Sequence, residues 1–231
     1  EHVNTWMTLG FMLMRQGELQ GAENAFVNCE QLIEESDYEA LAYLENNLGQ
    51  LAYAKGQWGI ALQHHNKSLG YAIELKNEAL QVSNYINRGF LHSLRGQHTY
   101  AIQQCESAIS LLKNLPKTKD NLHRLCVVIT YLGSTYRHSS DYEKASEHYQ
   151  KSLQISQDII DLEVECEAYQ QLGINLHLQG RALRRQERDF LEACKLQYDA
   201  WKNITKALEI AYRTNWSIAL SDGLNRLAKI Y

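Results

Sequence analysis

Small and apolar residues return in the same order five times along the chain. Each copy opens with a glycine and has a second glycine or a serine seven positions later; in the first four copies an alanine and a larger side chain follow. The copies read Gly10, Gly17, Ala22, Phe26; Gly49, Gly56, Ala61, His65; Gly89, Gly96, Ala101, Cys105; Gly133, Ser140, Ala145, Tyr149; and Gly173, Gly180. The apolar positions around them have helical spacing, so each copy predicts two helices joined by a short turn.

The residue types at these positions have physical reasons. The first glycine and the alanine lack bulk, which lets two helices approach closely. The second glycine ends the first helix, because glycine accepts the left-handed conformation that a helix C-terminus needs. One such hairpin cannot bury its own apolar face, so neighbouring hairpins are expected to stack into a solenoid.

Proline usage and repeat spacing support long helices with short turns. Pro116 is the single proline, while Leu, Ala, Gln, Glu and Lys, which favour helices, are plentiful. The steps from one opening glycine to the next are nearly equal, except that the step from Gly89 to Gly133 is longer. Only this longer step contains residues typical of loops, at 114–120, so we expect a longer connection there.

The recurring residues resemble the tetratricopeptide-repeat signature, W-x2-L-G-x2-Y followed by G-x-Y-x2-A-x3-F. Trp6, Leu9 and Gly10 open the first copy with its full beginning. The resemblance covers essentially the whole chain and implies an all-α fold, a right-handed α-α superhelix of about five helical hairpins plus a final unpaired helix. The repeats fall at about 3–40, 41–80, 81–122, 123–162, 163–215 and, in part, 217–231.

The fifth repeat carries an insert, 181–195. This insert lacks Pro and Gly, and Leu183, Phe190, Leu191 and Cys194 are predicted to share one helical face. Either both helices run two turns longer as a protruding hairpin, or the insert is a dedicated docking element. Its basic face would be Arg181, Arg184, Arg185 and Arg188, although an ordinary solvated face would look much the same. The sixth repeat stops partway, so we expect a fragment of a longer array.

Composition and charge narrow the function classes. The 231 residues carry a formal net charge of −4, which is not the basic footprint of a nucleic-acid-binding protein. No stretch approaches the length of a transmembrane helix, so neither nucleic acid nor membrane is an expected partner. The five cysteines are scattered without a CxxC pair. We interpret them as small buried residues in a reducing compartment and expect a cytoplasmic protein.

No residue pattern indicates catalysis or a cofactor. The chain has no phosphate-binding loop, no GxGxxG and no HExxH. His64 and His65 are adjacent and therefore point in different directions on a helix, which is unfavourable for a shared metal ion. Cys29 and Cys105 fall at predicted core positions, where a nucleophile is unexpected. We expect a protein that is not an enzyme and needs neither metal nor cofactor.

The resemblance implies that the first helix of each repeat lines a concave groove, through signature positions 2, 5, 6, 9, 12 and 13, with the opening glycine at position 8. In the first repeat these include Asn4 and Thr8. The candidate ligand-binding residues are Tyr43, Asn46, Asn47, Gln50, Tyr53, Asn87, Phe90, Tyr131, Arg137, Gln170, Gln171 and His177. Asn47, Asn87 and Gln171 share position 6, and a row of amides can bind the backbone of an extended peptide. The groove lacks the paired Lys and Asn of chaperone-binding repeats.

Two functions remain open at this stage. The first is a scaffold that recognises a protein or an extended peptide in its groove. The second is an effector-sensing domain of a STAND-type signalling ATPase or transcription regulator, since the long period and style of the repeats resemble such proteins. There the ligand would be an inducer, which could be a small molecule, and the array would control autoinhibition of other domains of the same full-length chain.

Overall fold

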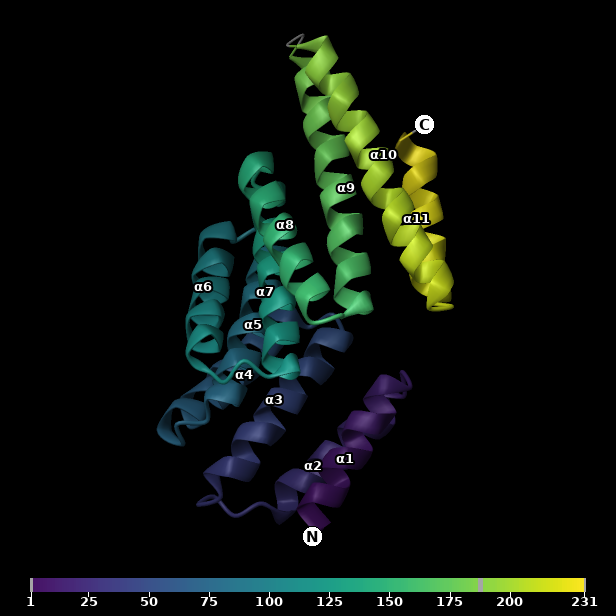
Figure 1. The fold of residues 1–231 in the computed structure, drawn as a ribbon. Helices are drawn as coiled ribbons and strands as arrows, with labels where there is room; N and C mark the ends of the chain where they lie inside the picture. The colour runs from purple at the N-terminus through teal and green to yellow at the C-terminus, as the bar shows by residue number, and fades with distance from the viewer. Residues whose placement is uncertain (1, 187–188, 231) are drawn as a thin grey trace. The chain divides into compact units, whose positions relative to one another are not determined.

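The computed structural model describes residues 2–186 and 189–230, which form eleven α-helices and no strand (Figure 1). Their bounds are His2–Arg15 (α1), Leu19–Leu32 (α2), Tyr38–Ala54 (α3), Trp58–Glu74 (α4), Glu78–Leu94 (α5), His98–Asn114 (α6), Lys119–His138 (α7), Tyr142–Asp158 (α8), Leu162–Arg185 (α9), Phe190–Arg213 (α10) and Ser217–Ile230 (α11). The predicted all-α fold of five hairpins and a final helix is confirmed for this part of the chain.

The chain consists of two compact units, residues 1–111 and 112–231. In the first unit, α1 packs on α2, α2 on α3, α3 on α4 and α4 on α5. In the second, α7 packs on α8, α8 on α9, α9 on α10 and α10 on α11. The first helices of successive hairpins are also neighbours, as α1 with α3, α7 with α9, and α9 with α11. These odd-numbered helices therefore form a face of their own within each unit.

One contact repeats in all five hairpins and explains the opening glycines. A Cβ atom added to Gly10, Gly49, Gly89, Gly133 or Gly173 would lie within 3.1 Å of a side chain of the partner helix. These side chains are Phe26, His65, Cys105, Tyr149 and Ile204, respectively. The separation of glycine and partner along the chain is the same in the first four hairpins and is longer in the fifth by the length of the insert, 181–195. The fifth hairpin thus keeps the same packing around additional residues.

The second glycine of each copy has the predicted role only in the first three hairpins. Gly17, Gly56 and Gly96 have φ of 83°, 74° and 69°, and each follows the end of the first helix. Ser140 takes this left-handed position in the fourth hairpin, with φ of 65°. Gly180 instead lies inside α9, where an added Cβ would be 3.1 Å from the Ala193 carbonyl oxygen. Its small size serves the close approach of α9 and α10.

Ile160 is a strained member of the same class of turn. It follows α8 with φ of 53° and is largely exposed, although left-handed backbone is unfavourable for a β-branched residue. We expect Ile160→Gly to raise the free energy of unfolding of the second unit by about 0.5–1 kcal/mol, because strain relief exceeds the entropy cost of glycine. Urea unfolding measures this. Ile160→Val, which keeps the β-branched side chain and therefore the strain, should give no comparable gain; equal effects of the two variants would contradict the explanation.

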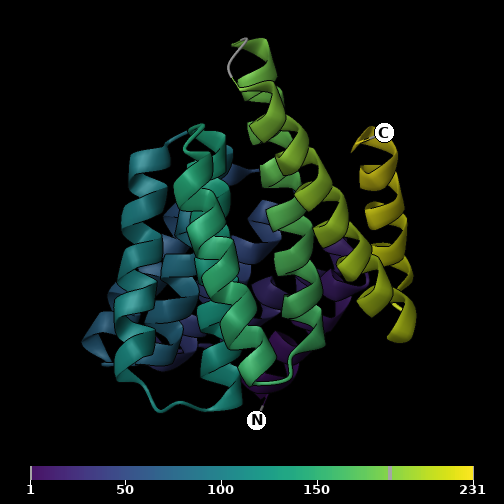
Figure 2. The same ribbon diagram turned by 45° about the horizontal axis from the view of Figure 1, so that its top comes forward.

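The fifth hairpin is longer than the others because both of its helices are longer. α9 and α10 each have 24 residues, whereas α3, α4, α5 and α8 have 17. The difference is about two turns of helix. Figure 2 shows the tip of this hairpin reaching past the end of the neighbouring α8. The insert therefore extends both helices of the fifth hairpin, as the first alternative predicted. This geometry does not test a docking role.

Two sequence predictions about irregular segments are wrong. Leu183 does not share a helical face with Phe190, Leu191 and Cys194, because α9 ends at Arg185 and a new helix begins at Phe190. The predicted longer connection at 114–120 is only residues 115–118. The Thr118 hydroxyl accepts a hydrogen bond from the Asn121 N–H at 3.2 Å, and α7 begins there with 20 residues. Most of the extra length is therefore helix rather than loop.

Candidate functional site

Signature position 5, predicted to face the groove, is buried in the second, fourth and fifth repeats. Asn46 is 8% exposed and Gln170 is 3% exposed. The Gln170 amide nitrogen donates to the Ala219 carbonyl oxygen at 3.1 Å, so this side chain packs between α9 and α11. Both residues were candidate ligand contacts, and the structure places them in the seams between helices instead. The other predicted groove positions, 2, 6, 9, 12 and 13, are half-buried or exposed in the described residues of all five repeats.

In the first unit, aromatic and amide side chains lie together on α3 and α5. The Tyr53 and Phe90 rings contact each other edge to face across the two helices, with centroids 5.4 Å apart. Tyr43, at the other end of α3, accepts a hydrogen bond through its hydroxyl from the Asn77 amide at 3.3 Å. Tyr43 and Tyr53 are exposed, whereas Phe90 is half-buried. We call the face that carries these residues the α3–α5 face.

The amides on the α3–α5 face are available. Asn47, Gln50 and Asn87 are half-buried, and their side chains form no hydrogen bond to any residue within 2–186 or 189–230. A primary amide offers two donors and one acceptor with two lone pairs, so three such groups carry substantial unused hydrogen-bonding capacity. Next to the Tyr53–Phe90 pair, they can bind a ligand that presents both polar and apolar groups.

In the second unit, the side chains on the equivalent face of α7 and α9 form hydrogen bonds with one another. Arg137 on α7 donates through Nη1 to the Gln171 side-chain oxygen at 2.6 Å and to its carbonyl oxygen at 3.5 Å. The Gln171 amide nitrogen donates to Glu167 Oε1 at 2.6 Å. Burial lowers the pKa of Arg137, and neighbouring Arg226 lowers it further, while Tyr149 acts in the opposite direction. Unlike Asn47 and Asn87, Gln171 at position 6 has both ends of its amide engaged.

The remaining candidates on α7 and α9 are also built into the second unit. His177 Nδ1 lies 2.7 Å from the Gln197 side-chain oxygen, and the Gln197 amide nitrogen donates to the His177 carbonyl oxygen at 3.1 Å. His177 is thereby tied to α10. Tyr131 is half-buried on α7. Among the proposed basic residues of the insert, Arg181, Arg184 and Arg185 are exposed, and Arg188 lies outside the described residues.

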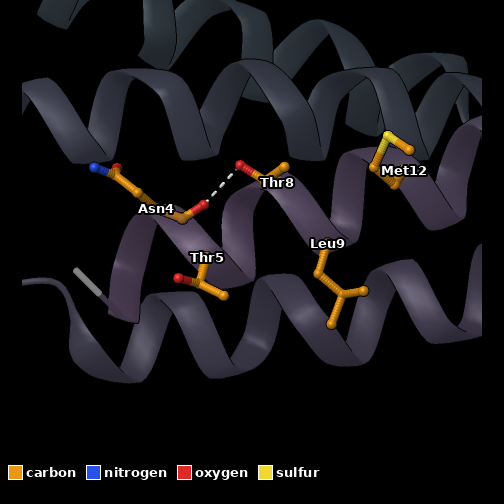
Figure 3. Close-up of a pocket in the computed structure, with 5 residues that line it drawn as sticks. All are labelled: Asn4, Thr5, Thr8, Leu9 and Met12. Carbon is orange, nitrogen blue, oxygen red and sulfur yellow. Dashed lines mark hydrogen bonds between the residues drawn. The ribbon is translucent and has the colours of Figure 1, made fainter.

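A shallow pocket on α1 combines two predicted groove residues, Asn4 and Thr8, with three residues that were not predicted to bind a ligand. Asn4, Thr5, Thr8, Leu9 and Met12 line it on successive turns of the helix (Figure 3). Thr5, Leu9 and Met12 are at signature positions 3, 7 and 10, whose equivalents in α3 are Leu44, Leu48 and Leu51. Leu44 and Leu51 are buried in the core with α2, and Leu48 packs against it. The pocket is therefore the uncovered helix-packing side of α1, and comparison of register positions could have identified it.

Potential metal ligands and reactive thiols are the groups of the described residues that bear most directly on chemistry. The described residues contain no group of three His, Cys, Asp or Glu side chains placed to hold a metal ion. Burial raises the pKa of the Cys105 thiol to about 12, and those of Cys126 and Cys166 to about 11. Thiols that stay protonated are poor nucleophiles. None of the helices in this part of the chain has the combined length and apolar character that crossing a membrane requires.

Comparison with known proteins identifies the repeat. A family model described as the tetratricopeptide repeat matches residues 124–184. Hsp70-Hsp90 organizing protein 3 of Arabidopsis thaliana is 29% identical over 116 residues, which are 48% of this chain and 19% of that protein. The chain thus spans about a fifth of the length of this curated relative.

Solved structures share the fold at low sequence identity. BtubC from P. vanneervenii superposes with a TM-score of 0.72 at 17% identity, covering 92% of this chain and 81% of that one. A STAND protein with a tetratricopeptide repeat sensor, from Pyrococcus horikoshii, gives 0.78 at 13% identity and covers 98% and 32%, respectively. A Rap protein complexed with Competence and Sporulation Factor gives 0.66 at 12% identity and covers 99% and 74%. These likenesses show the fold alone.

Proposed function

We propose that this array of tetratricopeptide repeats is a non-enzymatic scaffold that binds an extended peptide segment of a protein partner on its α3–α5 face. The observation that carries the proposal is the set of unpartnered amides of Asn47, Gln50 and Asn87 beside the Tyr53–Phe90 pair. An extended peptide alternates N–H and C=O groups, and amide side chains pair with both. The aromatic pair supplies apolar area for a side chain of the peptide.

The Rap complex supports binding in general, since a protein of similar fold holds Competence and Sporulation Factor. We do not extend Hsp70 or Hsp90, which the name of the Arabidopsis relative mentions, to this chain, because its groove positions lack the paired Lys and Asn of chaperone-binding repeats. A cytoplasmic location is part of this proposal, and the buried free cysteines, which suit a reducing compartment, support it.

Removing two of the amides should weaken peptide binding without affecting the fold. We expect Asn47→Ala with Asn87→Ala to raise the Kd of a peptide selected from a displayed random library by about tenfold to a hundredfold, because each lost hydrogen bond is worth about 0.5–1.5 kcal/mol. Isothermal titration calorimetry measures the Kd, and circular dichroism should show unchanged helicity. Neither amide has a partner in the described structure, so the fold has no bond to lose.

A matched double variant separates this face from the rest of the surface. Asn66→Ala with Asn114→Ala removes two exposed amides from α4 and α6 and should leave the Kd unchanged. If the Asn47 and Asn87 variant binds the selected peptide as tightly as the parent protein, the α3–α5 face is not the binding site.

The alternative is the effector-sensing domain of a STAND-type regulator, binding an inducer that relieves autoinhibition. The STAND protein superposes on 98% of this chain, which supports this alternative through similarity of fold alone. A thermal-shift screen of small molecules distinguishes the two, because a ligand that binds only the folded state raises the melting temperature. A small-molecule hit whose effect survives the Asn47 and Asn87 substitutions would favour the sensor over the peptide scaffold.

A further inference from the structure

The tip of the long α9–α10 hairpin, residues 181–186 and 189–195, carries two large apolar side chains that nothing in the described structure covers. Phe190 is 74% exposed and Leu191 is 79% exposed, although both lie in the first turn of α10. Ala193 and Leu196, slightly further along α10, are buried against α9. Phe190 and Leu191 therefore add little to the core. They are the first two residues of α10, and the α9–α10 hairpin extends past α8 (Figure 1).

Three arginines lie in the last turns of α9, the helix that leads into the tip. The Arg184 guanidinium lies 5.8 Å from the centroid of the Phe190 ring, and Arg181 and Arg185 are exposed one turn away or less. None of the three forms an ion pair with a carboxylate among the described residues. The chain as a whole has a net charge of −4, so this basic tip contrasts with the rest of the molecule.

The acidic residues of the tip are already engaged. Asp189 caps α10, its carboxylate accepting a hydrogen bond from the Glu192 N–H at 3.0 Å. Glu192 lies 3.7 Å from the Lys195 ammonium group. What the tip presents outward is thus an apolar pair beside guanidinium groups that form no ion pair with a described carboxylate, although Arg184 also donates to the Cys194 Sγ at 3.8 Å. Planar guanidinium groups bind carboxylates with two parallel hydrogen bonds, which makes carboxylates the complementary chemistry.

We propose that the α9–α10 tip is a docking surface for a protein partner that presents an apolar pocket bordered by carboxylates. Phe190 and Leu191 enter the pocket, while Arg181, Arg184 and Arg185 pair with its acidic rim. An anionic lipid surface fits less well, because the carboxylates of Asp189 and Glu192 share the first turn with the two apolar side chains and would enter the bilayer interface with them. The tip belongs to the second unit, whereas the α3–α5 face belongs to the first.

The test uses a fluorescein-labelled amphipathic peptide of repeated Glu-Glu-Leu-Leu units, and the same peptide with Lys in place of Glu. We expect fluorescence anisotropy to show binding of the acidic peptide only. Phe190→Ser with Leu191→Ser should weaken it by about tenfold or more, since two apolar side chains lose their burial. Arg181→Gln with Arg185→Gln should weaken it similarly and flatten its dependence on salt. All of these residues are exposed, so the melting temperature should be unchanged.

Tyr212→Ser with Arg213→Gln is the matched control, because it removes an exposed aromatic residue and an arginine from the opposite end of α10. It should bind like the parent protein, as should the Asn47 and Asn87 variant. Absence of binding, or equal loss in the control, would overturn the proposal. So would tip-dependent binding to vesicles of phosphatidylserine and phosphatidylcholine, which would assign the tip to lipid, or a tip-dependent dimer in sedimentation equilibrium, which would assign it to a second copy.

Discussion

Replacing Tyr149 with alanine should lower the free energy of unfolding of the second unit by about 3–5 kcal/mol. Tyr149 is the largest fully buried side chain of the described residues. Its ring fills the space opposite Gly133 of α7, where an added Cβ would lie 2.8 Å away, and it packs with Leu172 of α9. Its hydroxyl lies 3.0 Å from the Ser134 hydroxyl. One side chain of α8 thereby joins three helices, and truncation leaves a cavity among them.

Two further tyrosine variants divide this effect into its parts. Tyr149→Phe keeps the ring and should cost only about 1 kcal/mol for the lost hydrogen bond. Tyr212→Ala removes a tyrosine that is 78% exposed and should change stability by less than about 0.5 kcal/mol. Urea unfolding gives the free energies, and hydrogen exchange of α7, α8 and α9 localises the effect, since repeat arrays need not unfold in one step. A cost below about 1 kcal/mol for Tyr149→Ala would contradict the role of this ring.

The hairpins could be predicted from the sequence because their packing is local and periodic. The glycine of the first helix and the large side chain of the second have the same separation along the chain in four hairpins, so each pair is visible within one repeat. The greater separation of Gly173 and Ile204 matches the insert that the sequence located in the fifth repeat. Glycine there marks close contact between helices, a requirement that any larger residue would violate.

The site was harder to predict because it depends on neighbours far along the chain. A helical residue is rotated by about 100° from the next. A shift of one position therefore moves a side chain from a solvent-exposed face to an interface between helices. Gln170 faces Ala219, 49 residues away, and no pattern inside the fifth repeat indicates that contact. The engagement of Gln171 likewise depends on Arg137, 34 residues earlier. Asn47 and Gln171 occupy the same position of the repeat. The Asn47 amide is available and the Gln171 amide is engaged because their neighbours differ.

The break in the insert did carry a signal. Asp189 with Glu192 three positions later is the pattern of a helix N-terminus, and the structure shows the Asp189 carboxylate in that capping role. Placing Leu183 on one helical face with Phe190, Leu191 and Cys194 overlooked this pattern, because the segment contains neither Gly nor Pro. The consequence is functional, since the new helix begins with Phe190 and Leu191 at the tip of the hairpin rather than in the core.

The first unit contains a buried histidine that should make its stability depend on pH. His65 lies against Gly49, and its Nδ1 donates to the Asn84 side-chain oxygen at 3.1 Å. The Asn84 amide nitrogen is already committed as a donor to Ser68 Oγ and to the Leu80 carbonyl oxygen. Burial lowers the pKa of His65 to about 4, chiefly because the charged imidazolium loses its hydration, while the bond to Asn84 opposes the shift.

Acidification from pH 6.5 to pH 4 should therefore cost the first unit about 3 kcal/mol of unfolding free energy. In this range the unfolded chain, with a histidine pKa near 6.5, binds a proton that the folded chain does not, so full stability is present above pH 6.5 and is lost as the pH falls towards 4. Urea unfolding at a series of pH values measures how the free energy of unfolding changes with pH.

His65→Phe is the control, because Phe26 and Tyr149 show that the equivalent position accepts an aromatic ring against a glycine. That variant leaves the Asn84 oxygen without its donor and should be less stable than the parent protein near neutral pH, but it should lose the additional decrease between pH 6.5 and 4. If it keeps the slope of the parent protein, His65 is not the titrating group.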